Sequence, residues 1–123
     1  MDEIFRFDCV FYYVLDLDQA IRFYTEVLGL RLLSRDAVAR FDINGVLMEL
    51  VPTSDKSLTQ GSGNARLTLS VDDIYGVAAG LQAEGVSVAP VHQVRNGHVS
   101  SLTDPDGNEI VLWQSALTSK FDT

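Results

Sequence analysis

Few side chains in this chain are of a type that does chemistry on its own. There is one cysteine, Cys9, and there are two histidines, His92 and His98. A thiol with no visible neighbouring base is mostly protonated at neutral pH, so we expect Cys9 to be a small buried hydrophobe. The spacing of the two histidines indicates no metal site, and we expect His98 to be an exposed strand residue. The sequence supports neither a Ser-His-Asp arrangement nor the paired carboxylates of a hydrolase.

Composition limits the class of protein further. The 123 residues suffice for one domain with its own core, and the 46% hydrophobic content favours an ordered globular protein. Seventeen acidic against nine basic residues give a formal net charge of −8, which repels nucleic-acid phosphate, and no basic patch is visible. Neither a membrane span nor a signal peptide is visible, and one cysteine permits no intramolecular disulfide. We therefore expect a cytoplasmic protein whose partner is a neutral or cationic small molecule, with no nucleic acid and no membrane partner.

The elements that position these side chains follow one plan that occurs twice. In residues 14–30, apolar side chains recur at three- and four-residue steps, which indicates an amphipathic helix. Asp16 and Gln19 fit a capping box at its start, and Gly29 fits a left-handed residue at its end. Residues 71–86 repeat the plan with a helix that is one residue shorter. A repeat of half the chain indicates two modules of the same architecture.

Aromatic and β-branched residues and turn signals predict the strands of each module. The predicted strands are residues 5–14, 30–35, 37–43, 46–51, 65–71, 86–94, 98–103 and 109–114, and the second helix is residues 74–84. Asn44-Gly45 predicts a type I′ hairpin turn, Asn96-Gly97 repeats that signal, and Pro90 places its strand at an edge or a bulge. Each half therefore begins with a β-α-β-β-β order.

These elements predict one domain over residues 1–123. Module one covers about 5–51, a linker 52–64, module two about 65–114 and a tail 115–123. The linker is polar and long for a compact domain, so it is a candidate lid over a pocket. Its Gly61-Ser62-Gly63 lacks the lysine and the helix that follow a phosphate-binding loop, and we interpret it as a flexible tether.

Two stretches carry a resemblance to a known family. They are Val14-x-Asp16-Leu17-x-x-Ala20-x-x-Phe23-Tyr24-x-x-Val27-Leu28-Gly29-Leu30 and, ahead of the last strand, Asp104-Pro105-Asp106-Gly107-Asn108. From about Asp8 to Gln114 the chain resembles the glyoxalase I / bleomycin resistance / extradiol dioxygenase superfamily, also called vicinal oxygen chelate. The resemblance implies an α+β fold in which two βαβββ modules form curled mixed sheets around a cavity, with the helices outside. It also implies a homodimer.

Enzymes of that superfamily hold a divalent metal with side chains from four strand positions. The resemblance assigns these positions to Cys9, Glu49, Arg66 and Val111. Only Glu49 is a hard oxygen ligand, because an arginine offers no lone pair and a valine has no ligand atom. One thiolate and one carboxylate fall short of the three or four ligands that such a site needs. We therefore expect no metal and no cofactor.

Alternation along the strands extends this set to the lining of a cavity. The expected ligand-binding residues are Cys9, Phe11, Tyr13, Leu47, Glu49, Arg66, Thr68, Val111 and Trp113. Aromatic walls with few polar groups are typical of a small-molecule site. Two alternatives stay open: Glu49 and Arg66 neutralise each other across the cavity, or Trp113 fills a core.

Three functions are compatible with these residues. The first is a metal-free binding protein of the bleomycin-resistance type, which sequesters an aromatic antibiotic or metabolite, with the acidic composition favouring a cationic one. The second is a metal-independent isomerase or lyase with Glu49 as general base and Arg66 stabilising a developing oxyanion. The third is a metal-dependent glyoxalase or dioxygenase, against which the residues at positions 66 and 111 argue. We rank them in that order.

Overall fold

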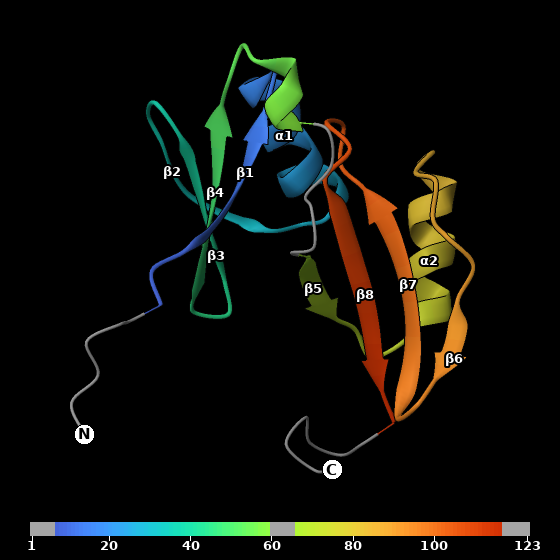
Figure 1. The fold of residues 1–123 in the computed structure, drawn as a ribbon. Helices are drawn as coiled ribbons and strands as arrows, with labels where there is room; N and C mark the ends of the chain where they lie inside the picture. The colour runs from blue at the N-terminus through green and yellow to red at the C-terminus, as the bar shows by residue number, and fades with distance from the viewer. Residues whose placement is uncertain (1–6, 60–65, 117–123) are drawn as a thin grey trace, which may run out of the picture. The chain divides into compact units, whose positions relative to one another are not determined.

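The computed structural model describes residues 7–59 and 66–116, and the chain divides into two compact units, residues 1–60 and 61–123. The first unit contains β1 (Val10–Val14), α1 (Leu17–Arg22), the π-helical η1 (Phe23–Val27), β2 (Arg31–Arg35), β3 (Ala39–Ile43), β4 (Val46–Pro52) and the short 3-10 helix η2 (Lys56–Thr59) (Figure 1). The second contains β5 (Leu67–Ser70), α2 (Ile74–Ala83), β6 (His92–Val94), β7 (Gly97–Thr103) and β8 (Glu109–Ser115). The predicted α+β class with two βαβββ modules is confirmed.

The two sheets share one topology. The strand orders are β1-β4-β3-β2 in the first unit and β5-β8-β7-β6 in the second. In each sheet the first strand pairs with the last strand in parallel, and the other pairs are antiparallel. Both sheets are therefore mixed, as predicted, and the sequence repeat is a repeat of topology.

The first helix begins as predicted but continues differently. The Asp16 carboxylate accepts a hydrogen bond from the Gln19 amide at 3.0 Å, which confirms the N-cap. After Arg22 the helix widens into η1, where the Leu28 amide donates to the Phe23 carbonyl at 3.1 Å, a five-residue step. Gly29 then ends it at a φ of 70°. The three- and four-residue apolar steps do not reveal this widening, because they describe a face and not a hydrogen-bond register.

The second helix is attached to its sheet at its first turn. The Asp73 carboxylate accepts from the Gly76 amide at 3.1 Å and so caps the helix. The Gln114 side chain, from β8, accepts from the Ile74 amide at 2.7 Å. Gly85, with a φ of 87°, follows the C-terminal residue Glu84.

Each module has its own core between the helix and one face of the sheet. In the first, the ring centroids of Tyr24 and Phe41 lie 5.8 Å apart, and Met48 and Leu50 are fully buried in the same module. In the second, the buried apolar side chains come from α2, β7 and β8, and they are Ile74, Ala78, Leu81, Leu102, Ile110 and Leu112. The opposite face of each sheet holds the alternate residues of every strand.

The Asp-Pro-Asp-Gly turn positions the start of β8. The Gly107 amide donates to the Asp104 carbonyl at 3.0 Å, which closes the predicted turn. The buried Asp104 carboxylate accepts from the amides of Asp106 and Asn108 at 2.9 Å and from Nδ2 of Asn108 at 2.8 Å. Buried polar groups that are satisfied in this way hold a loop in one conformation.

Several predicted strands are shorter in the structure, and two of them lose the most residues. The strand predicted over 5–14 begins at Val10, and residues 5 and 6 lie outside the described residues. The strand predicted over 86–94 is reduced to β6 and a single bridge between Val88 and Leu102. Pro90 interrupts it, because a proline has no amide hydrogen for a strand ladder. β6 is an edge strand, as the proline predicted.

One of the two predicted Asn-Gly turns is displaced by a residue. Asn44 and Gly45, with φ values of 53° and 89°, form the predicted turn between β3 and β4. In the second hairpin Val94 pairs with Gly97, so the turn is centred on the two residues before Gly97. Gly97 belongs to β7 and is required there by packing: a Cβ would overlap the Gln114 carbonyl oxygen and lie 2.7 Å from Cη2 of Trp113.

Part of the predicted linker forms a short helix. Its η2 begins beside Asp55, whose carboxylate accepts from the Ser57 amide at 3.0 Å and from the Ser57 hydroxyl at 2.7 Å. These hydrogen bonds lower the pKa of Asp55. Gly61-Ser62-Gly63 and residues 117–123 of the predicted tail lie outside the described residues, and the role of the linker as a lid stays a prediction. None of the helices in the described ranges is long and apolar enough to cross a membrane.

Candidate functional site

The face of the first sheet that points away from α1 carries a row of four side chains, one from each strand. The strand pairing sets Phe11 opposite Glu49, Glu49 opposite Arg40, and Arg40 opposite Ser34. Directly paired residues lie on the same face of a sheet, and the next residue on each strand lies on the other face. Because Phe41 packs against the helix, this row lies on the opposite face. We call this surface the open face.

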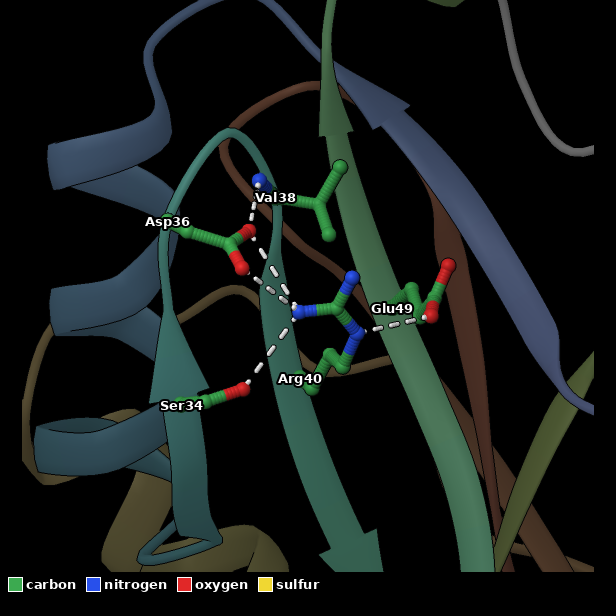
Figure 2. A network of polar contacts seen from close by, with 5 residues as sticks. All are labelled: Ser34, Asp36, Val38, Arg40 and Glu49. Atoms are coloured by element: carbon green, nitrogen blue, oxygen red, sulfur yellow. Dashed lines mark hydrogen bonds and ion pairs between the residues drawn. The ribbon is translucent and has the colours of Figure 1, made fainter.

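Arg40 is the centre of the polar contacts in this row (Figure 2). Its Nε donates to Oε2 of Glu49 at 3.2 Å. Its Nη1 contacts both carboxylate oxygens of Asp36, at 3.1 and 3.3 Å, and the Ser34 hydroxyl at 3.5 Å. The side chains are 22% exposed for Glu49, 35% for Arg40 and 65% for Asp36, so the network runs from half-buried to solvent-exposed.

The contacts between Arg40 and Asp36 favour the charged form of both side chains. A hydrogen bond from the Val38 amide, at 3.1 Å, and then the Arg40 guanidinium lower the pKa of Asp36. Asp36 in turn raises the pKa of Arg40, with a smaller effect from Glu49. A guanidinium is protonated throughout the physiological range, so it is a permanent positive charge beside Glu49.

Sequence reasoning missed Arg40, although a signal for it was present. The Asn44-Gly45 turn pairs Ile43 with Val46, and counting back along both strands pairs Arg40 with Glu49. Alternation then places both side chains on one face.

An aromatic pair lies at the β1 end of the open face. Phe11 and Tyr13 meet edge to face, with ring centroids 5.2 Å apart and an angle of 87° between the rings. Phe11 is 47% exposed, whereas the intervening Tyr12 and the following Val14 are buried on the helix side. Leu47, a predicted site residue, is half-buried on β4 two residues before Glu49. An exposed ring beside a half-buried carboxylate can bind an aromatic ligand that also makes one polar contact.

Cys9 lies directly before β1 and is partly exposed, so the expectation of a fully buried residue is wrong. Burial raises the pKa of the Cys9 thiol, and the negative charges of Glu49 and Asp8 raise it further. A thiol in acidic surroundings is a poor nucleophile and a poor metal ligand at neutral pH, because both roles need the thiolate. Its protonation was predicted, and the structure supplies the cause.

The second sheet carries the other predicted site residues on the face away from its buried core. Thr68 pairs with Val111, which lies between the buried Ile110 and Leu112, and Trp113 lies two residues further along β8. Trp113 is half-buried and its ring lies over Gly97. Arg66 lies directly before β5, and its Nε is 3.3 Å from Oε1 of Glu109.

Glu49 and Arg66, the two charged residues of the predicted cavity, each have an ion-pair partner other than one another. Glu49 pairs with Arg40, and Arg66 pairs with Glu109, each within its own unit. A contact between Glu49 and Arg66 stays a prediction, as does a ligand-binding role for the nine predicted residues.

The two histidines belong to the second unit. His92 is exposed on β6, whereas His98 is half-buried on β7 with its ring 5.9 Å from that of Tyr75, so it is less exposed than expected. Among the residues that the structure describes, no group of three or more His, Cys, Asp or Glu side chains is arranged to hold a metal ion.

Comparisons with known proteins agree with this architecture. The sequence profile of the Glyoxalase/Bleomycin resistance protein/Dioxygenase superfamily matches residues 6–112. The chain is 30% identical over 119 residues to a "Probable lactoylglutathione lyase" of Vibrio parahaemolyticus, with 85% of this chain and 86% of that protein covered. The structure of TnmS3, an antibiotic binding protein from Streptomyces sp. CB03234, matches with a TM-score of 0.78 at 28% identity, covering 94% of this chain and 99% of that one. A glyoxalase/bleomycin resistance protein from the same organism matches with a TM-score of 0.66 at 29% identity, covering 87% and 100%.

Proposed function

The chain belongs to the Glyoxalase/Bleomycin resistance protein/Dioxygenase superfamily, and within it we propose that this protein binds a small molecule without a metal ion. The ligand is an aromatic antibiotic or metabolite, cationic or neutral, and the protein acts by sequestering it. The similarity to TnmS3, an antibiotic binding protein, supports this proposal.

The observation that carries the proposal is the open face of the first sheet. Phe11 is 47% exposed and stands edge to face with Tyr13, and it lies opposite the half-buried Glu49. Aromatic stacking supplies contact area and the carboxylate supplies one directed hydrogen bond. A ligand-binding role for Trp113 and the other predicted residues of the second sheet stays a separate proposal.

The side chains at the four metal positions of the family do not fit a divalent metal. Arg66 offers no lone pair and is engaged with Glu109, and Val111 has no ligand atom. The raised pKa of Cys9 disfavours the thiolate that a metal would need. Glu49 alone is an oxygen ligand, and its Oε2 is already in contact with Arg40.

A second candidate function is a metal-independent isomerase or lyase. The similarity to a probable lactoylglutathione lyase favours it, with Glu49 as general base and Arg66 as the group that stabilises a developing oxyanion. The two functions differ in one result. If the protein is an enzyme, Glu49→Gln abolishes turnover; if it is a binding protein, the wild type releases its ligand chemically unchanged. A metal-dependent glyoxalase or dioxygenase would lose activity on chelation and regain it with metal.

The test uses Trp113, the single tryptophan, as an intrinsic fluorescent reporter. Small molecules that co-purify with the protein are first identified by mass spectrometry, and planar antibiotics and phenolic metabolites are then titrated after dialysis against EDTA. We expect binding in EDTA, and Phe11→Ala should weaken it about tenfold, since a lost ring contact costs roughly 0.5–1.5 kcal/mol beyond its area.

Tyr75→Ala is the matched control for this titration. Tyr75 is 61% exposed on α2, an element of the second unit, and it is not among the predicted ligand-binding residues, so its removal should leave the affinity unchanged. Affinity that vanishes in EDTA, or that is insensitive to Phe11→Ala, would contradict the proposal.

Two further features of the protein are proposed with this function. We expect a homodimer, on the resemblance to the family, and action in the cytoplasm, where a lone thiol such as Cys9 stays reduced.

A further inference from the structure

Glu49, the carboxylate in the cross-strand row, forms an ion pair with Arg40 of the same unit. Oε2 of Glu49 accepts from Nε of Arg40 at 3.2 Å. The other oxygen, Oε1, has no hydrogen-bond partner within residues 7–59 and 66–116. The side chain is 22% exposed, and Glu49 pairs across the strands with Phe11, so Oε1 is the oxygen that Glu49 retains as an acceptor on the open face.

Arg40 is held from the other side and cannot turn away from Glu49 without losing several contacts. Asp36 contacts Nη1 with both carboxylate oxygens, and it is itself held by the Val38 amide at 3.1 Å. Ser34 adds a contact at 3.5 Å. A guanidinium with contacts at two edges has a defined orientation, because its donors form a rigid planar fork.

A β-bulge on β2 brings Ser34 into this arrangement. Leu32 pairs with Phe41 and Ser34 pairs with Arg40, which leaves Leu33 as the extra residue. In a regular ladder continued from Leu32, Leu33 would lie opposite Arg40 instead. Bulges commonly redirect a side chain in this way.

The charge of Arg40 decides what Oε1 can accept. A cation that approached Oε1 would lose part of its hydration and would meet the guanidinium of Arg40 a few ångströms away, at a half-buried position where repulsion is poorly screened. A neutral O–H or N–H group donates to the carboxylate without that repulsion. The excess negative charge of the network lies at Asp36, which is 65% exposed and turned toward Nη1.

Building on the proposed function, we propose that Arg40 is a specificity-determining residue that converts Glu49 from a cation site into an acceptor for a neutral donor. The ligand class is then an aromatic compound that carries a phenolic or alcoholic O–H or an amide N–H beside its ring. Aromatic ammonium compounds are selected against.

The experiment compares two probes of the same shape, 2-naphthylmethanol and 2-naphthylmethylammonium, which differ in charge. Binding is followed by the NMR shifts of the Phe11 and Glu49 amides in the full-length protein. Wild type should prefer the alcohol. Arg40→Met should shift the ratio of the two affinities at least tenfold toward the ammonium compound. Arg40→Lys, which keeps the charge, should retain the preference of the wild type.

Arg35→Met is the matched control. It removes the same charge from a neighbouring arginine that pairs with Asp18 on α1 and has no contact with Glu49. It should leave the affinity ratio within twofold of the wild type. If Arg40→Met fails to fold, Arg40→Gln gives the same readout.

A wild type that prefers the ammonium probe, or a ratio that Arg40→Met leaves unchanged, would overturn the role of Arg40 and leave the proposed function standing. Absence of any shift on the open face with either probe would overturn the proposed function and this role together.

Discussion

At the scale of single residues, the acidic surroundings of Cys9 have a measurable consequence. Burial, Glu49 and Asp8 raise the thiol pKa, in that order, so alkylation by iodoacetamide should have its midpoint above the value of about 8.5 for free cysteine. Glu49→Gln removes one of these charges and should lower the midpoint. A raised thiol pKa stabilises the fold below the unfolded value, and this stabilisation is lost as the pH rises through the folded pKa.

Glu26→Gln, on the exposed side of η1, is the charge control for this measurement, and Cys9→Ser should abolish the reaction, since the chain has no other cysteine. A midpoint equal to that of free cysteine would contradict the assignment.

Asp36 responds to pH in the opposite direction. Its pKa is lowered by the Val38 amide and by Arg40, so its contribution to stability is complete above the unfolded value of about 3.9 and is lost as the pH falls through the folded pKa. We therefore expect Asp36→Asn to lower the Tm at pH 7 and to have a smaller effect near pH 3. Thermal unfolding followed by circular dichroism measures both. An equal loss of Tm at the two pH values would show that the charge of Asp36 does not matter.

At the scale of elements, two glycines predict opposite results for the same substitution. Gly97→Ala places a Cβ against the Gln114 carbonyl and 2.7 Å from Cη2 of Trp113, which should destabilise the protein by roughly 1–3 kcal/mol. Gly80 lies inside α2, and apart from its chain neighbours and the backbone of the helix itself nothing lies within 4 Å of the position that an added methyl group would take, so Gly80→Ala should stabilise by about 0.5–1 kcal/mol. Urea unfolding with tryptophan fluorescence measures both changes.

Gly97→Ala should also change the emission of Trp113 in the folded state, because the ring must move to make room. Equal stability of the two variants would show that the Trp113 ring does not pack against Gly97 of β7.

At the scale of the whole molecule, the expected homodimer can be tested directly. Light scattering should give a mass near 27 kDa, twice the 13.5 kDa of one chain, at micromolar concentration. All five residues of β2 are exposed in the single chain, and they include Leu32 at 37% and Leu33 at 49%, apolar surface that a partner could cover. A mass of 13.5 kDa at that concentration would show a monomer.

The sequence alone was sufficient for the features that depend on neighbours within a few positions. The Asp16 cap, the left-handed Gly29 and the Asn44-Gly45 turn were all predicted and are all present. Such features are decided by the conformational preferences of one or two residues and by hydrogen bonds that close within one turn. The repeat and the alternation of burial followed in the same way, so the two modules and the faces of their strands could be predicted.

The tertiary structure decided which carboxylate Arg66 meets and which contacts hold Arg40 beside Glu49. The sequence suggested Arg66 as the cation for Glu49, whereas the folded chain pairs Glu49 with Arg40 and Arg66 with Glu109. The pairing of Arg40 with Glu49 follows from the hairpin register that the Asn44-Gly45 turn sets, whereas no local pattern indicated the bulge at Leu33 that brings Ser34 opposite Arg40. Ion pairs are set by distances between side chains that are remote in sequence, and a register shift of one residue replaces the partner. For the same reason only the folded protein shows that Oε2 of Glu49 is engaged by Arg40 and that Oε1 is the oxygen left for a ligand.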